Sequence, residues 1–270
     1  MCEPTRYGIE YEINPWMHRA NPVDPVRAHE QWDRLVDTLQ GLGTKVEFIP
    51  QPRGLPDMTF TANAGVVSGN TFFPSNFRFP ERRGERSHFI QWFEDHGYDV
   101  KAVDALYFWE GEGDVLPSES GSIAGFRFRT ELAALDQLDL MLDGPMVRVE
   151  LADPRFYHLD TSFCPLAGGL ALYYPPAFTQ EGARLLQRYF PKIVPIGIED
   201  ALRFACNALV VSDTVILNAG CRETVAALNS AGYQCIEVPM DEFIKAGGSV
   251  KCLVLTLDRF TETSQGKAAG

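Results

Sequence analysis

The chain has 270 residues, 45% of them hydrophobic and 22% charged, a composition typical of globular proteins and unlike that of disordered ones. Its 36 acidic residues outnumber its 24 basic ones, and the net charge of −12 argues against a general nucleic-acid binder. No stretch approaches the roughly 20 apolar residues of a membrane-spanning helix, and no secretory signal is visible at the N-terminus.

Five segments have the periodicity of amphipathic helices, with apolar side chains gathered on one face. In chain order, they cover residues 26–42, 81–95, 131–142, 176–190 and 222–230. Their starts, at positions 26, 81, 131, 176 and 222, are therefore 55, 50, 45 and 46 residues apart. A spacing this regular indicates an internal structural repeat.

The sequence around these helices recurs as well. A glycine followed by a run that contains β-branched residues comes after three of them, in segments 43–50, 97–104 and 232–239. The glycine is typical of a left-handed helix C-cap, and the run after it predicts a strand. Before several helices lie two short apolar runs, such as 206–212 and 214–217, whose junction Ser212-Asp213 fits a tight hairpin.

Each repeat therefore has the order strand, strand, helix, strand. Five such units could close into a ring that leaves the helices outside, and an open α/β sheet of two domains is the alternative. No linker rich in proline or serine divides the chain, so we expect one domain over residues 1–260. Residues 261–270 are expected to be a disordered tail.

The six cysteines are scattered, without a C-x-x-C pair or the spacing of a zinc site. We expect them to be free thiols in a reducing cytoplasm. The acidic run from Glu110 to Asp114 lacks the ligand count of a calcium loop, and no phosphate-binding glycine motif occurs. No metal or cofactor is therefore expected.

Two cysteines are candidate nucleophiles. Cys252 follows Gly247-Gly248 and is expected to begin an apolar strand, where neighbouring cationic charge would help its reactivity. A buried core cysteine is the alternative interpretation. Cys221 opens the predicted helix 222–230, whose dipole would lower its pKa, but it occupies an ordinary helix start of the repeat, so a structural role is favoured.

One histidine has a distinctive neighbourhood. His18, His29, His88 and His96 have the context of solvated surface residues. By contrast, His158 lies in a predicted strand, where alternation would place Asp160 on the same side as the imidazole. A carboxylate there could orient the ring or bind a substrate, although a core histidine would fit equally well.

Four motifs in a fixed order carry a family resemblance. They are Pro56 to Gly65, Glu110 to Asp114, His158 to Thr161, and Gly247 to Cys252. Together they resemble the guanidino-modifying enzymes of the pentein superfamily, namely arginine deiminase, dimethylarginine dimethylaminohydrolase and glycine amidinotransferase. The resemblance covers residues 7–257 and implies a five-bladed α/β propeller of ββαβ repeats with pseudo-fivefold symmetry, in agreement with the repeat.

The resemblance also implies roles for individual residues. Cys252 would be the nucleophile, His158 the general acid and base, and Glu110 the carboxylate that pairs with His158 and the substrate guanidinium. Four more residues would bind substrate: Asp57 and Asp160 its polar parts, and Arg82 and Arg129 its α-carboxylate. A bidentate guanidinium–carboxylate pair gives the two arginines a physical reason for that role.

The sequence departs from the family pattern at two places. Asn63 stands where deiminases and dimethylargininases carry an acidic residue, and with Asn14 it resembles the pentein domain of arginine dihydrolases. Those enzymes convert arginine to ornithine, ammonia and carbon dioxide, and a neutral Asn63 could accept a ureido group for a second hydrolysis. The acidic motif is also one residue longer, so Glu110 and Glu112 compete for the catalytic role.

The expected function is therefore that of a hydrolase of C–N bonds in linear amidines, which acts on arginine or an arginine derivative through a covalent thiouronium on a cysteine. Ornithine or citrulline would be released with ammonia. The alternatives are a dimethylarginine dimethylaminohydrolase, an amidinotransferase and a non-catalytic pentein that binds a partner. The expected ligand is a small guanidino compound, with neither nucleic acid nor membrane as a partner. The oligomeric state stays open, a homo-oligomer included.

Overall fold

The computed structural model describes residues 1–257 as a mixed α/β fold of small sheets and flanking helices. The tail expected to be disordered, residues 261–270, lies outside the described residues. The helices, in chain order, are α1 (Pro25–Gly41), α2 (Pro80–Arg83), α3 (Glu85–Asp95), α4 (Gly111–Asp114), α5 (Leu132–Asp139), α6 (Gln180–Tyr189), α7 (Ile198–Leu202), α8 (Arg222–Ser230) and α9 (Asp241–Ile244). Within residues 1–257, none of these helices has the length and apolar character to cross a membrane.

The strands of residues 1–257 form four three-stranded sheets with one topology. In each sheet the first two strands pair antiparallel, and the third pairs with the second in parallel. The first two sheets consist of β1 (Gly65–Ser68), β2 (Thr71–Pro74) and β3 (Asp99–Val100), and of β4 (Val115–Ser118), β5 (Gly121–Phe126) and β6 (Met146–Glu150). The other two consist of β7 (Phe163–Pro165), β8 (Leu170–Tyr173) and β9 (Lys192–Pro195), and of β10 (Leu209–Val211), β11 (Thr214–Asn218) and β12 (Gln234–Val238).

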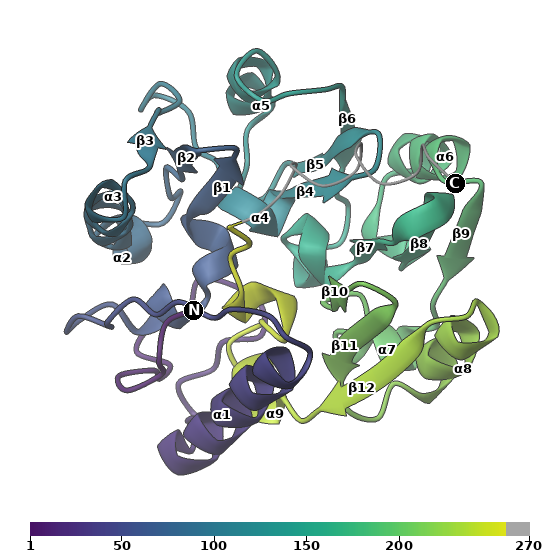
Figure 1. Cartoon of the computed structure of the whole chain (residues 1–270), viewed down its shortest axis with the longest axis horizontal. Coiled ribbons are helices and arrows are strands. Elements are labelled where there is room, and N and C mark those ends of the chain that lie inside the picture. The colour runs from purple at the N-terminus through teal and green to yellow at the C-terminus, as the bar shows by residue number, and fades with distance from the viewer. Residues whose placement is uncertain (258–270) are drawn as a thin grey trace, which may run out of the picture.

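A helix lies between the second and third strand of every sheet, so the predicted unit is confirmed four times. Figure 1 shows the four sheets and α1 around a common centre, with α3, α5, α6 and α8 toward the outside. The helices predicted over 26–42, 131–142 and 222–230 correspond to α1, α5 and α8. The helix predicted over 81–95 is split at Gly84 into α2 and α3, and the one predicted over 176–190 starts as a 3₁₀ turn before α6.

The glycines after three helices have the conformation that the sequence predicts. Gly43, Gly97 and Gly232 have φ values of 81°, 81° and 92°, in the left-handed region that favours glycine. The strand predicted over 43–50 is wrong, however, because only Ile49 pairs there, in an isolated bridge with Cys2. Within residues 1–257, no strand pairs with residues 44–48.

Helix α1 shows how the sequence sets these elements. The Asp24 side chain accepts hydrogen bonds from the N–H groups of Val26 and Arg27, at 3.0 and 3.2 Å, and caps the first turn. Pro25 follows at a position where its missing N–H costs nothing. The buried face, which includes Leu35 and Leu39, packs in one cluster with β12, α9 and Cys252. Packing of α1 thereby supports the turn around Cys252.

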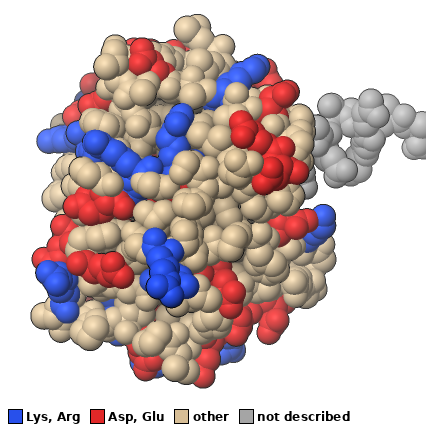
Figure 2. All heavy atoms as spheres, turned by 90° about the vertical axis from the view of Figure 1, so that its left-hand side faces the viewer, with Lys and Arg blue, Asp and Glu red and all other residues tan. Residues whose placement is uncertain are grey.

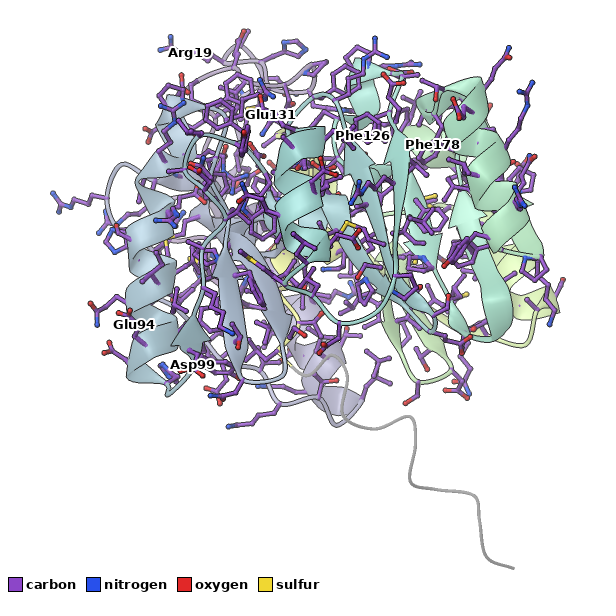
Figure 3. The ribbon with its side chains drawn as sticks, turned by 90° about the horizontal axis from the view of Figure 1, so that it is seen from above. Arg19, Glu94, Asp99, Phe126, Glu131 and Phe178 are labelled. Carbon is purple, nitrogen blue, oxygen red and sulfur yellow. The ribbon has the colours of Figure 1, made fainter. Side chains whose placement is uncertain are left out.

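Two of the predicted site residues are close in sequence to residues at one end of the molecule. Figure 3 shows Arg19 and Glu131 at one end, and Glu94 and Asp99 at the opposite end. The predicted site residues Asn14 and Arg129 lie close in sequence to the first pair. On the face shown in Figure 2, acidic and basic side chains are interspersed.

Candidate active site

Short helical turns beside the sheets hold most of the predicted site residues. Asp57 and Asn63 belong to the 3₁₀ turns Pro56–Thr59 and Thr61–Ala64 before β1. Glu110 directly precedes α4 and follows the bridge between Trp109 and Asn76.

Two predicted strands at the site are wrong. His158 immediately precedes the 3₁₀ turn Leu159–Thr161, and Cys252 lies inside the 3₁₀ turn Lys251–Leu253. The chain turns at His158 because Asp114 Oδ1 accepts the Leu159 N–H at 3.0 Å and the Thr161 hydroxyl donates to the His158 carbonyl at 2.7 Å. His158 and Asp160 consequently have different partners, and they do not share one face of a strand.

Cys252 is buried, at 2% exposure, and its sulfur has two polar partners. Asp160 Oδ2 lies 3.2 Å from Sγ, and Asn207 Nδ2 donates to Sγ at 3.1 Å. Burial raises the pKa of the Cys252 thiol well above its usual value, and the Asp160 charge raises it further. Burial also raises the pKa of Asp160 to about 7. The thiol of the free protein therefore holds its proton beside a carboxylate.

His158 forms a second polar group with Glu110 and Arg129. The imidazole Nε2 lies 2.8 Å from Glu110 Oε2, and Arg129 Nη1 donates to that same oxygen at 2.8 Å. Burial lowers the pKa of His158 to about 4, and Glu110 opposes this shift. Burial would raise the pKa of Glu110, but Arg129 and His158 hold it well below its usual range. At neutral pH, His158 is therefore neutral beside an ionised carboxylate.

Asn63 and Asp57 are held by Arg82. Arg82 Nη1 donates to Asn63 Oδ1 at 2.8 Å, and Nη2 donates to the Asp57 carbonyl at 3.1 Å. Glu85 accepts from Nε and Nη2 of the same guanidinium, at 2.8 and 2.9 Å. The planar fork of Arg82 is thus already engaged by a buried carboxylate, whereas Arg129 has no comparable bidentate partner among the described residues.

Asn14 belongs to a segment that lies over the site. Its Nδ2 donates to the Ala246 carbonyl at 3.0 Å, and the Tyr157 hydroxyl donates to the Gly247 carbonyl at 2.7 Å. Next to Asn14, the Ile13 carbonyl accepts from Arg129 Nη2 at 3.0 Å. The N-terminal segment therefore closes against the turn that precedes Cys252.

A narrow cavity connects most of these side chains. It is lined by Ile13, Asn14, Met17, Asp57, Phe60, Asn63, Arg82, Arg129, Tyr157, Ala246, Gly247, Gly248 and Cys252. Six of the nine predicted site residues line it, Glu110 and Asp160 contact the lining residues Arg129 and Cys252, and His158 contacts Glu110. A wider groove at the opposite end, beside His96 and Tyr98, has none of the nine among the described residues that line it.

The structure gives different partners to the two competing glutamates. Glu110 contacts His158 and Arg129, whereas Glu112 accepts a hydrogen bond from Lys251 Nζ. Lys251 Nζ also donates to the Val254 carbonyl at 2.9 Å, so this pair ties α4 to the C-terminal turn. The geometry therefore favours Glu110 as the partner of the imidazole.

Three buried polar atoms at the site lack a hydrogen-bond partner of normal geometry among residues 1–257. They are Oδ1 of Asp57, Oδ1 of Asp160 and Nδ2 of Asn63. Burial raises the pKa of Asp57, and the nearby Arg82 and Tyr11 hydroxyl oppose this shift. Buried polar atoms are nearly always satisfied, so such a group calls for an explanation. A ligand with several N–H donors would satisfy the two carboxylate oxygens.

The sequence did not single out every residue of this arrangement. Asn207, Tyr157 and Glu85 make the contacts described above, but none of them stands in a recognisable motif. Asn207 reaches Cys252 from the loop before β10, 45 residues away in the chain, through tertiary structure alone. Lys251 could have been recognised from the sequence, because it directly precedes the candidate nucleophile Cys252.

Comparison with known proteins finds relatives that are named for reactions of arginine or dimethylarginine. A sequence model of the family described as N,N-dimethylarginine dimethylhydrolase, eukaryotic, matches residues 14–259. The bifunctional arginine dihydrolase/ornithine cyclodeaminase ArgZ of Synechocystis sp. is 42% identical over 94% of this chain, but that alignment spans only 37% of the relative's length. The N(G),N(G)-dimethylarginine dimethylaminohydrolase of Mycobacterium tuberculosis is 38% identical, over 95% of this chain and 84% of the relative.

Solved structures agree with the sequence comparison. The N-terminal domain of ArgZ with a covalently bound reaction intermediate is 42% identical and superposes with a TM-score of 0.91, over 94% of this chain and 95% of that one. A dimethylarginine dimethylaminohydrolase adduct with S-methyl-L-thiocitrulline has a TM-score of 0.82 over 94% of this chain and 96% of that one, at 22% identity, which supports the fold alone.

Proposed function

This chain belongs to the N,N-dimethylarginine dimethylhydrolase family, within the pentein superfamily, and from this premise we propose that it hydrolyses the guanidino group of arginine or of an arginine derivative. The observation that carries the proposal is a cysteine sulfur 3.2 Å from Asp160 Oδ2, in a cavity that Asp57 and Asn63 also line, with a buried polar atom left unsatisfied on each of these three polar side chains. Two carboxylate oxygens, on Asp57 and Asp160, would accept the N–H groups of a guanidinium. A cationic ligand would also offset the cost of burying these charges.

We further propose that the domain is a single five-bladed propeller, expected over residues 1–260. Four ββαβ units are regular, and both ends of the chain would supply the fifth blade. Cys2 bridges to Ile49, and the Thr59 hydroxyl donates to the Cys2 carbonyl at 3.2 Å. The Thr61 hydroxyl donates to the Leu253 carbonyl at 2.8 Å and joins the first regular unit to the C-terminal turn.

When the cationic guanidinium binds, its charge favours the Cys252 thiolate, and the imidazole of His158, which is neutral in the free protein, takes up the proton. The thiolate then attacks the guanidinium carbon and forms a C–S bond. His158 returns the proton to the leaving nitrogen, and ammonia departs as the C–N bond breaks. Asp57 and Asp160 hold the guanidinium and supply orientation and electrostatic stabilisation. Glu110 holds the imidazole in place.

Hydrolysis of the thiouronium completes the first cycle. His158 removes a proton from water as the oxygen attacks the same carbon. The C–S bond then breaks, the sulfur regains a proton, and a ureido product leaves. Arginine would in this way give citrulline and ammonia without a cofactor.

The α-carboxylate is assigned to Arg129, with Arg82 behind it. Arg129 lines the cavity and has one carboxylate contact in the free protein, so its guanidinium can engage a second anion. Because Arg82 holds Glu85 through a bidentate pair, its part is to orient Asn63 and to add positive charge.

Asn63 supports a second hydrolysis. Since its Oδ1 accepts from Arg82, its Nδ2 is presented as a donor, and that donor has no partner of normal geometry among residues 1–257. A guanidinium offers only donors, whereas the carbonyl oxygen of a ureido group is an acceptor. Citrulline would therefore fit Nδ2 better than arginine does. A second cycle would release another ammonia and a carbamate that decomposes to ornithine and carbon dioxide.

The test is incubation with arginine and chromatographic separation of citrulline from ornithine. Ornithine with two ammonia molecules supports the dihydrolase form of the proposal, and citrulline with one ammonia reduces it to a deiminase. Asymmetric dimethylarginine is assayed in parallel as the second candidate substrate, because the mycobacterial relative is named a dimethylarginine dimethylaminohydrolase. Transfer of the amidino group to glycine without ammonia, or inertness toward all guanidino substrates, would overturn the proposal.

A further inference from the structure

Asn207 is fully buried in the loop between α7 and β10, and the backbone around Cys252 converges on it. Its side-chain Oδ1 accepts the N–H of Ser249 at 3.1 Å and the N–H of Cys252 at 3.2 Å. Its main-chain carbonyl accepts the N–H of Lys251 at 3.2 Å. One residue therefore holds three backbone donors of the turn that presents the sulfur.

The other half of the amide points at the sulfur. Nδ2 donates to the Asp160 carbonyl at 3.2 Å and to Cys252 Sγ at 3.1 Å. A flipped amide would aim N–H groups at two backbone N–H donors, so the hydrogen-bond network fixes the orientation. The sulfur consequently lies between a donor, Asn207, and a carboxylate, Asp160.

We propose that Asn207 is a positioning residue for the nucleophile, which fixes the turn around Cys252 and donates an N–H that stabilises its thiolate. The inference rests on the proposed function, in which Cys252 attacks the substrate. A hydrogen bond to the charged form of a group favours that form, whereas the neighbouring carboxylate favours the neutral thiol. The pKa of Cys252 is raised by burial and by Asp160, and hydrogen bonds from the Ser249 backbone and from Asn207 oppose this shift.

Asn207→Asp separates this role from a merely structural one. The new carboxylate keeps an oxygen for the N–H groups of Ser249 and Cys252, but it replaces the donor at the sulfur with a second acceptor. Asn218→Asp is the matched control. Asn218 is also a buried asparagine, with Oδ1 accepting the Met240 N–H at 3.0 Å and Nδ2 donating to the Arg203 carbonyl at 2.9 Å.

The experiment measures the rate at which iodoacetamide alkylates Cys252 as a function of pH, with the modified site identified by peptide mass spectrometry. Thermal melting and turnover of arginine are measured on the same proteins. For Asn207→Asp we expect the alkylation midpoint to rise by about one pH unit and turnover near neutral pH to fall about tenfold or more. Asn218→Asp should leave the midpoint and turnover at wild-type values.

A folded Asn207→Asp protein with a wild-type midpoint would overturn the inference. If that variant does not fold, Asn207→Ala removes the donor without adding charge, and an unchanged midpoint there overturns it equally. An equal rise in the midpoint for Asn218→Asp would also contradict it, because the effect would then be general. Failure of the proposed function has a different signature, in which the wild-type protein turns over no guanidino substrate although Asn207→Asp still shifts the midpoint.

Discussion

Cys252 and Cys221 are both buried, the first inside a 3₁₀ turn and the second directly before α8, and their surroundings differ. Cys252 meets Asp160 and Asn207 and lines the site cavity. Cys221 belongs to an apolar cluster that spans the second, third and fourth sheets, and the Arg203 carbonyl lies 4.0 Å from its sulfur. Burial raises the pKa of Cys221 to about 12 despite its place before α8.

The comparison shows that position at a helix start does not make a thiol reactive. At Cys221, desolvation outweighs both the helix dipole and the charge of Arg203, which acts to lower the pKa of the thiol. At Cys252 the same desolvation acts, but an amide donor, a nearby carboxylate and a cavity lined by Asp57 and Asn63 accompany it. We therefore locate the chemistry in the polar surroundings of the sulfur.

The largest predicted effect separates the two cysteines directly. Cys252→Ser should lower turnover of arginine by about 10⁴-fold or more, because a hydroxyl is a far poorer nucleophile here than a thiolate. Cys221→Ser should keep at least half of the wild-type activity per folded molecule. Steady-state kinetics on both proteins, with circular dichroism to confirm folding, would reverse our assignment if the losses were exchanged.

The next largest effect is expected at Arg129, the residue proposed to bind the α-carboxylate of the substrate in the cavity that Cys252 also lines. Arg129→Ala should reduce kcat/KM for arginine by about 10²-fold, since a buried charged hydrogen bond is lost. Agmatine lacks the α-carboxylate, so the preference for arginine over agmatine should shrink in the variant. Arg127→Ala, an exposed arginine in the same loop, is the control. A preference that survives Arg129→Ala intact would remove Arg129 from substrate binding.

A smaller effect concerns pH and stability. The pKa of His158 is lowered from 6.5 to about 4 by burial, so the unfolded chain binds a proton that the native protein does not bind between these values. Stability should thus fall as pH drops through this window, by about 3 kcal/mol at most for this group. Urea unfolding of His158→Gln should show a shallower loss, while exposed His88→Gln should match the wild type. Parallel curves for all three proteins would contradict a buried neutral imidazole.

The smallest effect concerns the apolar region alone. Cys221→Ala should destabilise the protein by about 1–2 kcal/mol, because it leaves a small cavity in a close-packed cluster. Its turnover should stay at the wild-type level, which unfolding curves and kinetics on the same preparation can show. A marked fall in turnover without unfolding would erase the functional contrast between the two regions.

The repeat was predictable because helix periodicity and glycine caps are local signals. Helix α8 and the hairpin of β10 and β11 follow the sequence closely, with Ser212 at a φ of 56° in the turn. The sequence of residues 44–48 has the pattern of a strand, so their irregular structure could not be predicted. Only the tertiary structure shows that pairing there is limited to the bridge between Cys2 and Ile49.

Within the proposed site, the ordered motifs point to Cys252, His158 and Glu110, but they do not predict which side chains contact them. Alternation paired His158 with Asp160, whereas the 3₁₀ turn directs Asp160 toward the sulfur and leaves His158 with Glu110. Asn207 could not be found from the sequence, because a single buried asparagine has no spacing to recognise.

The central claim is that the Cys252 sulfur bonds to the guanidino carbon of the substrate. The most direct measurement is rapid acid quenching of the enzyme during turnover of arginine, followed by peptide mass spectrometry of all six cysteines. The account predicts one adduct, with the mass of arginine less ammonia, on the peptide that contains Cys252. An adduct on another cysteine, or turnover by the Cys252→Ser protein at the wild-type rate, would contradict it.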